Sequence, residues 1–382
     1  MEKLKIGLVG CGKAGHLHAA ALAKLPQSEF LAVSSSTPSR AEEFARKYNV
    51  KAYANVSEMV AREKLDVIHI CTPHPAHMEP AIEALKEGAN VFVEKPLASS
   101  LEDCDAILGM ATKVGKQIGV VSQRRFYAPC QRVKRAIEEG KIGKPVLGTI
   151  TILGWRDQAY YESDSWRGTW KGEGGGILVN QAPHQIDLLH WYMGEIDELY
   201  GIWGNLNHPY IEVEDTALAI LKFKNGGVGN IIVSNSQKPG IYGKVLIHGD
   251  NGASVGIQTD GGAMFIAGVS NIQEPPVNDI WSVPGEEKML KNWIKEDSDL
   301  FKKINPMEYF LQLQIEDFLN AILEERKPLV TGEEGRVTVE IFTAIYRSKR
   351  DRKAIKFPLN PEYDRIDFDG RLPDKGSEAQ QR

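Results

Sequence analysis

The feature that most constrains this chain is a set of three glycines close to its start, in the run GCGKAG at residues 10–15. The run follows the apolar stretch 4–9, which predicts a strand, and precedes residues 16–25, whose Ala/Leu spacing predicts a helix. Glycines between a strand and a helix permit a tight turn and let a pyrophosphate approach the backbone N–H groups at the helix N-terminus. The alternative is an ordinary cluster of turn glycines.

The alternation of strands and helices continues to about residue 124. Strands that alternate with helices at this spacing imply right-handed crossovers and a parallel sheet covered on both faces. The sequence therefore predicts an N-terminal Rossmann domain over residues 1–124. Its further predicted strands are 29–34, 67–71, 90–93 and 118–122, and its further predicted helices are 39–48, 56–63, 77–87 and 101–114.

Beyond residue 124 strand-like stretches dominate, which predicts a second α/β domain over residues 125–360 with one antiparallel or mixed sheet. Gly226-Gly227 predicts a hairpin turn between two of its strands. The polar tail 361–382 is expected to be an extended arm or disordered. The predicted strands are 146–154, 198–206, 216–223, 228–234 and 244–249, and the predicted helices are 129–139, 184–193, 307–324 and 334–348.

Composition excludes several classes of function. The length of 382 residues favours two domains, and no apolar stretch is long enough to cross a bilayer. The net charge of −5 comes without basic clusters, so neither nucleic acid nor a membrane is an expected partner. Four scattered cysteines lack metal-binding spacing, so no metal is expected. The start MEKLKIGLVG lacks the features of a secretory signal, and we expect a cytoplasmic protein.

The end of the second predicted strand bears on the cofactor. Many NAD enzymes carry an acidic residue there, which binds the ribose hydroxyls, whereas this chain has VSSSTPSR at 33–40. Because no carboxylate repels a 2′-phosphate and Arg40 adds a cation, NADP is the favoured cofactor, with NAD as the alternative. The alternative is that Arg40 is a solvated residue in the first turn of a helix and that the serines are ordinary helix caps.

Two further segments end predicted strands, where open α/β sheets bind their ligands. In CTPHPAH, residues 71–77, Thr72 is expected either to reach the cofactor or only to cap the next helix, and His77 to bind there or to satisfy backbone groups at the helix start. In VEKP, residues 93–96, a partly desolvated Lys95 beside a positive nicotinamide has a lowered pKa and can exchange a proton near neutrality. The alternative for Lys95 is a surface charge.

Residues 166–187 hold the densest group of candidate side chains. The triple glycine 174–176 lets the backbone pass close to another molecule, and Asn180 and His184 are one helical turn apart and can share a face. His184 suits general acid/base work if it faces a sugar-sized cleft. The alternative is that Asn180 is a helix cap and His184 is a core histidine with its hydrogen bonds satisfied. Aromatic residues nearby either stack on a sugar ring or belong to the core; they are Tyr160, Tyr161, Trp166 and Trp170.

These motifs together resemble the Gfo/Idh/MocA oxidoreductases, the family of glucose-fructose oxidoreductase and inositol dehydrogenase. The resemblance covers roughly residues 5–359 and rests on GCGKAG, CTPHPAH, VEKP, GGGILVNQAPHQIDLLHW, VEDTALAILKF and PLVTGEEGRVTVEIFTAIYRS. It implies a Rossmann domain followed by an α/β domain with a large, mostly antiparallel open sheet, through which homodimers or homotetramers form.

The resemblance also implies the site residues. Lys95 and His184 are expected to be the catalytic, proton-handling pair. Cofactor contacts are expected at Gly10, Gly12, Lys13, Ala14, Gly15, Ser35, Arg40, Thr72, His77, Glu94 and Lys95. Substrate contacts are expected at Lys95, Arg124, Tyr160, Trp166, Arg167, Asn180 and His184. Ser35 and Arg40 resemble the NADP-holding pair of glucose-fructose oxidoreductase, and Tyr53 its adenine-side tyrosine.

One position departs from the family pattern, because many members have aspartate where this chain has Asn180. An amide cannot ionise, so Asn180 must act by hydrogen bonding or bind a substrate hydroxyl. The expected activity is NAD(P)-dependent hydride transfer between nicotinamide and a ring hydroxyl or ketone of a sugar, glycoside or inositol. Two alternatives remain: glycoside cleavage through transient oxidation and elimination, and a dinucleotide-binding regulator without turnover.

Overall fold

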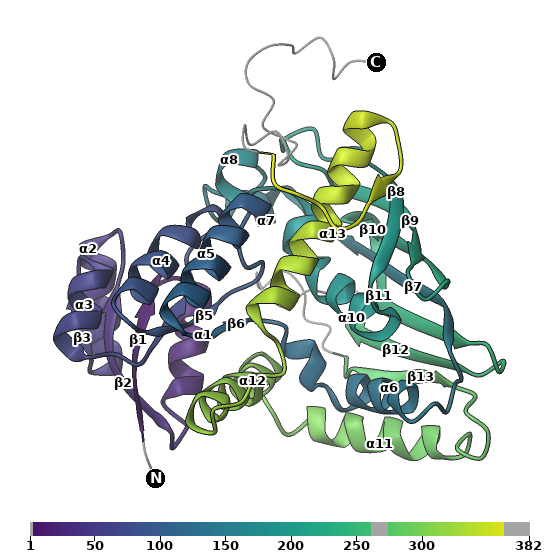
Figure 1. Cartoon of the computed structure of the whole chain (residues 1–382), viewed down its shortest axis with the longest axis horizontal. Helices are drawn as coiled ribbons and strands as arrows, with labels where there is room; N and C mark the ends of the chain where they lie inside the picture. The colour runs from purple at the N-terminus through teal and green to yellow at the C-terminus, as the bar shows by residue number, and fades with distance from the viewer. Residues whose placement is uncertain (1–2, 261–273, 363–382) are drawn as a thin grey trace. The chain divides into compact units, whose positions relative to one another are not determined.

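The computed structural model describes residues 3–260 and 274–362. The chain forms two compact units (Figure 1). The first unit comprises residues 1–98, 103–131 and 295–338, and the second comprises 99–102, 132–294 and 339–382. A single boundary after residue 124 therefore leaves out the segment 295–338, which belongs to the first unit although it lies in sequence between segments of the second. Most of the predicted tail 361–382 lies outside the described residues.

The first unit contains a six-stranded parallel sheet in the order β3-β2-β1-β4-β5-β6. The strand order reverses direction at β1 and β4, as in a Rossmann fold, so the predicted fold of this region is confirmed. The three-residue strand β3 is too short and too exposed to show a pattern in the sequence. The strands are β1 (Leu4–Val9), β2 (Ser28–Ser34), β3 (Lys51–Tyr53), β4 (Val67–Ile70), β5 (Asn90–Val93) and β6 (Ile118–Val120).

Helices cover both faces of this sheet, as right-handed crossovers require. Local chemistry sets their ends: Asn55 accepts a hydrogen bond from the N–H of Glu58 at the start of α3, and α2 begins at Pro38, where a missing N–H costs nothing. The helices are α1 (Lys13–Leu22), α2 (Pro38–Tyr48), α3 (Val56–Glu63), α4 (Met78–Lys86) and α5 (Leu101–Val114).

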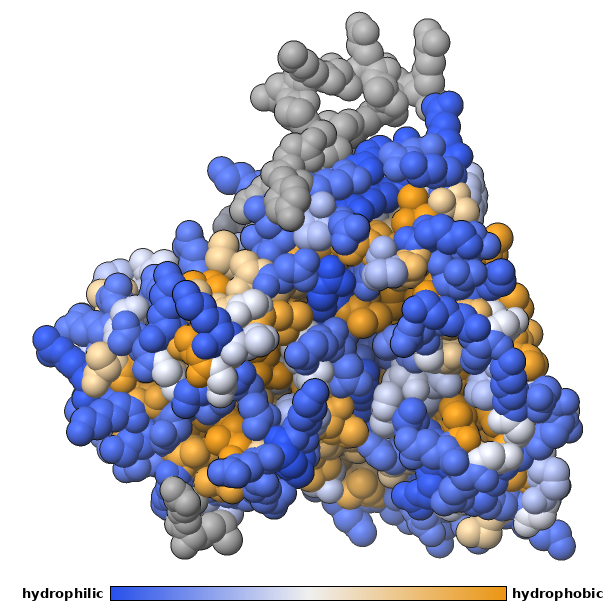
Figure 2. Space-filling view, in the orientation of Figure 1, coloured by the Kyte–Doolittle hydropathy of each residue, from blue (hydrophilic) through white to orange (hydrophobic). Residues whose placement is uncertain are grey.

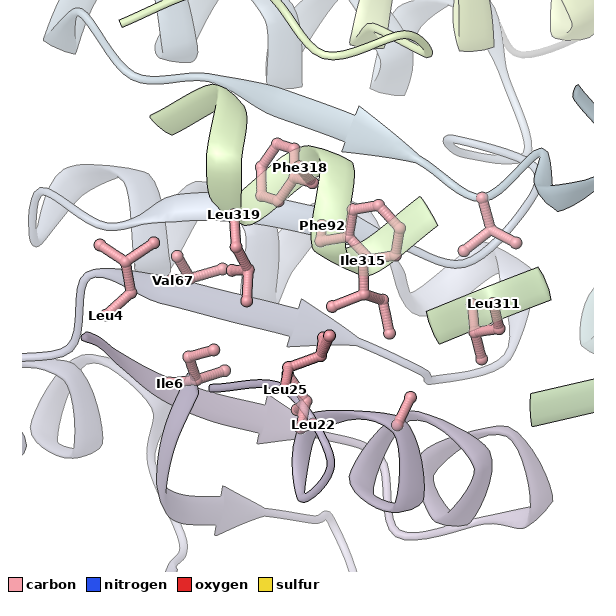
Figure 3. Packing of buried hydrophobic residues seen from close by; sticks show 12 residues of the cluster. Leu4, Ile6, Leu22, Leu25, Val67, Phe92, Leu311, Ile315, Phe318 and Leu319 are labelled. Atoms are coloured by element: carbon pink, nitrogen blue, oxygen red, sulfur yellow. The ribbon is translucent and has the colours of Figure 1, made fainter. Parts of the chain in front are cut away.

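A late helix, α12 (Pro306–Leu323), completes the core of the first unit (Figure 3). Its apolar side chains recur three and four residues apart, which places them on one face of the helix. This face packs on residues from β1, β4, β5 and α1. The cluster includes Leu311, Ile315, Phe318 and Leu319 of α12 and Leu4, Ile6, Leu22, Leu25, Val67 and Phe92 of the sheet, α1 and the segment after α1.

The second unit contains an eight-stranded sheet in the order β13-β12-β11-β7-β10-β9-β8-β14. Among the strands described in residues 3–260 and 274–362, only β7 and β10 of this sheet pair in parallel, so the predicted mostly antiparallel sheet is confirmed. Gly226, with φ +88°, forms the predicted hairpin turn between β9 and β10. The strands are β7 (Pro145–Trp155), β8 (Ile196–Gly204), β9 (Thr216–Phe223), β10 (Val228–Ser234), β11 (Ser236–Gly249), β12 (Ser254–Asp260), β13 (Val277–Trp281) and β14 (Ile355–Lys356).

The two faces of this sheet differ. Helix α10 (Pro183–Met193) contacts β7 and β11, and Ser348 of α13 (Gly332–Asp351) accepts a hydrogen bond from the N–H of Gly201 in β8. Side chains of β9 alternate between buried and exposed along the strand. Exposed apolar side chains lie on three adjacent strands: Tyr200 and Ile202 on β8, Leu218 and Ile220 on β9, and Val228 on β10. Figure 2 shows hydrophobic residues at the surface where β8 and β9 lie.

The remaining described helices lie between the elements named above. They are α6 (Ala128–Glu138), α7 (Gln158–Glu162), α8 (Trp170–Glu173), α9 (Ile177–Asn180) and α11 (Met289–Phe301), with 3-10 turns η1 (His74–Ala76) and η2 (Gln123–Phe126). Within residues 3–260 and 274–362, none of the helices has the length and apolar character needed to span a membrane.

Candidate functional site

The glycine turn after β1 is shaped by its own neighbours. Gly10 has φ +103°, and a Cβ there would lie 2.6 Å from the backbone of Cys71, while a Cβ on Gly15 would lie 2.2 Å from the carbonyl oxygen of Gly10. Gly12, in contrast, is exposed and has no neighbour within 4 Å of the position of a Cβ. Packing thus requires glycine at positions 10 and 15, whereas another molecule can approach the backbone at Gly12.

The start of α1 fits a pyrophosphate group. Its N-cap residue is Gly12, and no side chain caps the first turn. The first N–H groups of a helix have no partner within the helix, and they carry the positive end of its dipole. The turn from Gly10 to Gly15, including the exposed Lys13 and the half-buried Ala14, therefore has the backbone that binding of a dinucleotide needs.

The predicted NADP pair lies beside this turn. Ser35 directly follows β2, whose last residue Ser34 accepts a hydrogen bond from the N–H of Gly10 at 2.9 Å. The hydroxyl of Ser35 accepts from the N–H of Thr37 at 3.2 Å, and Arg40 is exposed in the first turn of α2. The structure thus places a hydroxyl and a cation at the end of β2, where the sequence predicts them.

The hydroxyl of Tyr53, at the end of β3, donates to the carboxylate of Glu63 in α3. This hydrogen bond, with some burial, raises the pKa of Tyr53 to about 12. The structure gives Tyr53 a structural partner, and its role at the adenine stays a prediction.

The segment after β4 is tied to the segment after β5 by a buried histidine. Thr72 donates from its hydroxyl to the carbonyl of Ala76, the last residue of the 3-10 turn 74–76, at 2.9 Å. The two ring nitrogens of His77 lie 2.9 Å from the carbonyl oxygens of Thr72 and Pro96. Burial lowers the pKa of His77 despite these acceptors. Both side chains thus contact backbone carbonyls, and their contact with a cofactor stays a prediction.

Glu94 and Lys95 form the turn that leaves β5. One carboxylate oxygen of Glu94, Oε1, lies 3.1 Å from Nε2 of His18 in α1, and Oε2 accepts from the backbone N–H of Lys95 at 3.1 Å. Burial alone would raise the pKa of Glu94, but the hydrogen bond from His18 and the charge of Lys95 bring it below its usual value. Glu94 is therefore an anion beside Lys95.

Arg124 lies in η2, directly after β6, and is buried. Apart from Tyr53, the residues predicted in the first unit thus follow the carboxyl ends of β1, β2, β4, β5 and β6. Because these strands are parallel, their carboxyl ends share one edge of the sheet, which is the edge where open α/β sheets bind ligands.

In the second unit the triple glycine is approached by the protein itself. A Cβ on Gly176 would lie 1.8 Å from the carbonyl oxygen of Glu214, and a Cβ on Gly175, which has φ +155°, would lie 2.4 Å from the hydroxyl of Tyr346. The expectation that these two glycines make room for another molecule is wrong, because Glu214, just before β9, and Tyr346 of α13 already occupy that space.

The carboxylate of Glu214 holds this turn and was not predicted as a site residue. Oε2 accepts from the N–H of Gly176 at 2.9 Å, and Oε1 accepts from the N–H of Leu178 at 3.0 Å and from the hydroxyl of Tyr346 at 2.9 Å. Complete burial raises the pKa of Glu214 to about 7 although all three donors favour the anion. The only sequence signal was an acidic residue in VEDTALA, immediately before an apolar strand.

Asn180 is held by a second buried carboxylate that sequence reasoning missed. Its Nδ2 donates to Oε1 of Glu173, and Oε2 of Glu173 accepts from the N–H of Gly168 at 2.6 Å. Glu173 is 1% exposed. An aspartate at position 180 would put two carboxylates in contact, so the asparagine matches its surroundings.

Predicted substrate residues meet around the hydroxyl of Tyr160. This oxygen accepts from Arg167 at 2.6 Å, from Gln181 at 3.1 Å and from Asn180 at 3.3 Å. Burial raises the pKa of Tyr160, which keeps it a neutral phenol. The guanidinium of Arg167 also lies 4.4 Å from the ring centre of Trp166. The structure therefore joins four of the predicted residues and adds Gln181.

Asn180 and His184 do not lie on one continuous helix, which corrects the prediction. Helix α9 ends at Asn180, and α10 begins at Pro183, whose ring cannot supply the N–H that a continuous helix needs. His184 is the second residue of α10 and is largely buried. Trp170 packs edge-on against Trp203 and Tyr346, so it belongs to the core of this unit.

Comparisons with known proteins agree with this architecture. Residues 4–122 match the model of the oxidoreductase family with an NAD-binding Rossmann fold, and residues 130–255 match the GFO/IDH/MocA C-terminal domain. The first unit is thus an NAD-binding Rossmann domain. The chain is 26% identical to a myo-inositol 2-dehydrogenase of Thermotoga maritima, with 92% of this chain and 98% of that protein covered.

Two further similarities differ in the ligand or substrate named. The chain is 26% identical to the scyllo-inositol 2-dehydrogenase (NAD(+)) of Bacillus subtilis, with 95% of this chain and 98% of that protein covered. The structure resembles the WlbA dehydrogenase from Bordetella pertussis in complex with NADH and UDP-GlcNAcA, with a TM-score of 0.82, 29% identity, and coverage of 94% and 99% of the two chains.

Proposed function

This chain belongs to the Gfo/Idh/MocA family of oxidoreductases, and from that premise we propose that it transfers a hydride between nicotinamide and a ring hydroxyl or ketone of a sugar, glycoside or inositol. The observation that carries the proposal is the position of Lys95. It leaves β5 at the same sheet edge as the open Gly12 backbone. A reacting group and a cofactor turn on one edge are what such a transfer requires.

The proposed chemistry divides between the two units. The bound nicotinamide supplies the hydride acceptor or donor. In oxidation, the imidazole of His184 takes the hydroxyl proton while Lys95 donates a hydrogen bond to the same oxygen, which becomes the ketone oxygen. In reduction, His184 returns the proton. Asn180 cannot take up a proton, so its amide, fixed by Glu173, positions a substrate hydroxyl.

The proposed substrate residues are the cluster around Tyr160 in the second unit and Arg124 in the first. The guanidinium groups of Arg167 and Arg124 are donors for hydroxyl or acidic groups on the ring. Relatives named for inositols and a relative solved with UDP-GlcNAcA both fit such a donor set.

The decisive experiment follows the reduced-nicotinamide absorbance band while the purified protein is given monosaccharides, inositols, glycosides and nucleotide-sugars. We expect turnover with at least one ring alcohol and stoichiometric change of the cofactor. Release of an aglycone without net change of the cofactor would instead support the elimination mechanism. Cofactor binding without turnover on the whole panel would overturn the proposal.

We further propose NADP as the preferred cofactor. Its added phosphate has no carboxylate to repel it at the end of β2, and Ser35 and the exposed Arg40 offer a hydroxyl and a cation there. The ratio of kcat/KM for NADP to that for NAD tests this proposal. Arg40→Ala should lower the value for NADP by about tenfold and leave that for NAD unchanged, since one charge-assisted contact contributes about 1.5 kcal/mol. A ratio that favours NAD in the wild type would overturn it.

We also propose that the exposed face of β8 and β9 forms a homodimer or homotetramer. Tyr200, Ile202, Leu218 and Ile220 are 39% to 66% exposed on adjacent strands, which is unusual for a surface that stays in water. Ile220→Glu should shift the mass measured by light scattering toward the monomer. Leu206→Glu is the control, because Leu206 is 73% exposed but lies in the loop after β8. An unchanged mass for Ile220→Glu would contradict this interface.

A further inference from the structure

From the arrangement of His18, Glu94 and Lys95 we infer that His18 is a positioning residue for Lys95, which it influences through Glu94. His18 lies on α1, one turn after Gly15, and has no part in the hydride-transfer scheme above. The inference rests on the proposed function only in giving Lys95 a role in the reaction. The contacts that carry it all lie within the first unit.

The contacts form a chain across three elements. Nδ1 of His18 lies 2.9 Å from Nδ1 of His69 in β4, and Nε2 of His18 lies 3.1 Å from Oε1 of Glu94 after β5. The other oxygen of Glu94 accepts from the N–H of Lys95 at 3.1 Å. Both imidazole side chains are completely buried, whereas that of Glu94 is 18% exposed.

The hydrogen-bond pattern fixes where the protons lie. The carboxylate of Glu94 only accepts, so Nε2 of His18 must carry a hydrogen. A single proton lies between the two Nδ1 atoms. If it were on His18, the neutral His69 would carry its hydrogen on Nε2, and in the described part of the chain that buried nitrogen has no partner. Burial lowers the pKa of His69 well below its usual value, so this ring is neutral.

The alternative arrangement leaves no N–H group unpaired. His69 donates from Nδ1 to Nδ1 of His18, and the Nε2 atom of His69 is a bare ring nitrogen, whose burial costs less than that of an unpaired donor. His18 then accepts at Nδ1 and directs its Nε2 hydrogen at Glu94. It supplies a fixed donor to the carboxylate.

The other ionisable groups near Glu94 do not replace this donor. The ring of His77 is committed to the carbonyls of Thr72 and Pro96. The thiol of Cys71 stays protonated, because burial and the charge of Glu94 raise its pKa. Lys95 supplies its backbone N–H and a nearby positive charge. His18 is the side chain that donates to Oε1.

The consequence for Lys95 follows from charge. An ionised Glu94 beside Lys95 favours the ammonium form of the lysine. Without the donor from His18, the largely buried carboxylate keeps the cost of burial but loses a compensating hydrogen bond, so its pKa rises. A neutral Glu94 no longer stabilises the ammonium, and Lys95 loses its proton at a lower pH. His18 therefore sets the pH range in which Lys95 is charged.

The test reads the lysine directly. Reductive ¹³C-methylation of the full-length protein labels the lysines for NMR titration, and Lys95→Arg assigns the Lys95 signal. In His18→Leu we expect the pKa of Lys95 to fall by about one unit, a tenfold change in its dissociation constant. His18→Gln keeps an N–H near the position of Nε2 and should restore the wild-type value to within a few tenths of a unit.

His69→Leu is the matched control, because it removes an equally buried imidazole from the same cluster but leaves the contact between His18 and Glu94 in place. It should leave the pKa of Lys95 near the wild-type value. A Lys95 titration that is unchanged in His18→Leu and His18→Gln, or an equal shift in His69→Leu, would overturn the inference. Absence of turnover on the substrate panel would affect the proposed function but not this titration.

Discussion

Two buried glutamates, one in each unit, hold the segments that carry the proposed reacting groups, and their surroundings affect them in opposite ways. Glu94 supports the turn of Lys95 and accepts from a histidine and a backbone N–H beside an ammonium, so its pKa is lowered. Glu214 supports the glycine turn before Asn180 and accepts only from neutral donors, so burial raises its pKa to about 7.

The difference shows that the number of hydrogen bonds does not decide whether a buried carboxylate is charged. Glu214 has three donors and Glu94 has two, yet it is Glu94 that is the stronger acid. At Glu94 the hydrogen bond from His18 and the neighbouring positive charge together outweigh burial, whereas at Glu214 the three donors do not. The first unit thus presents a fixed charge next to Lys95, whereas the second presents a rigid turn whose carboxylate titrates near neutrality.

The largest effect is expected when the reacting group is removed from one unit at a time. His184→Ala and Lys95→Ala should each lower turnover by about 10²-fold or more, since each removes a positioned proton-handling group. Circular dichroism and thermal unfolding should show an intact fold. A fully active His184→Ala protein would remove His184 from the mechanism and leave Lys95 as the proposed proton-handling residue.

The next effect tests the rigid turn of the second unit. Gly176→Ala places a methyl group where the carbonyl oxygen of Glu214 lies, 1.8 Å from the Cβ position. We expect a loss of unfolding free energy at or above the upper end of the roughly 1–3 kcal/mol typical of overpacking. Gly154→Ala, in the same unit, meets no atom within 4 Å and should change stability by less than about 0.5 kcal/mol. Equal stability of the two variants would contradict this packing.

The opposite pKa shifts predict opposite pH dependence. The pKa of Glu214 is raised, so its contribution to stability is greatest below the unfolded value near 4.5 and declines as the pH rises to about 7. Relative to Glu214→Gln, the wild type should lose up to about 3 kcal/mol of unfolding free energy between pH 4.5 and 7.5.

For Glu94 the sign reverses. Its lowered pKa gives a contribution that is present above the unfolded value and lost as the pH falls through the folded value. Urea unfolding of the wild type, Glu214→Gln and Glu94→Gln, over a pH range extended below 4.5 so that Glu94 also titrates, measures both slopes. Parallel slopes for the three proteins would remove the distinction between the two glutamates.

The smallest expected effect concerns Asn180. Asn180→Asp puts a second carboxylate against Glu173, and we expect it to cost about 1–2 kcal/mol of stability at pH 8 and less at pH 5, where one of the pair is protonated. Glu173→Gln in the same protein restores a donor facing the new aspartate and should recover most of the loss. Thermal unfolding of the single and double variants gives the coupling energy. No recovery in the double variant would show that Glu173 does not determine the residue at 180.

Much of the fold was predictable because its signals are local. The predicted strands 90–93, 216–223 and 228–234 and the predicted helices 56–63 and 101–114 have the same bounds in the structure. Apolar runs and alternation extend over a few residues, and a neighbouring Gly, Asn or Pro ends them. The strand β3 and the break between α9 and α10 were missed, because three residues show no period and a near-helical connection keeps the spacing of a helix.

The candidate site divides in the same way. Gly10, Gly15 and Lys95 were identified from the sequence because each lies next to a strand whose end the sequence marks. Glu173 and Glu214 were not, because nothing near them in sequence shows which N–H groups they accept from. Glu214 contacts residues 36 and 38 positions away and Tyr346, 132 positions away. Such pairs depend on how strands and helices pack, which a short-range pattern does not record.

By itself, the sequence determined a Rossmann domain with an open glycine turn, a second domain built on a mostly antiparallel sheet, and the segments that follow the relevant strands. Only the tertiary structure decided that 295–338 completes the first unit, that Glu214 and α13 fill the space beside the triple glycine, and that one buried glutamate is an anion while the other titrates near pH 7. The physical reason is that periodicity is set by neighbours along the chain, whereas burial and charge are set by neighbours in space.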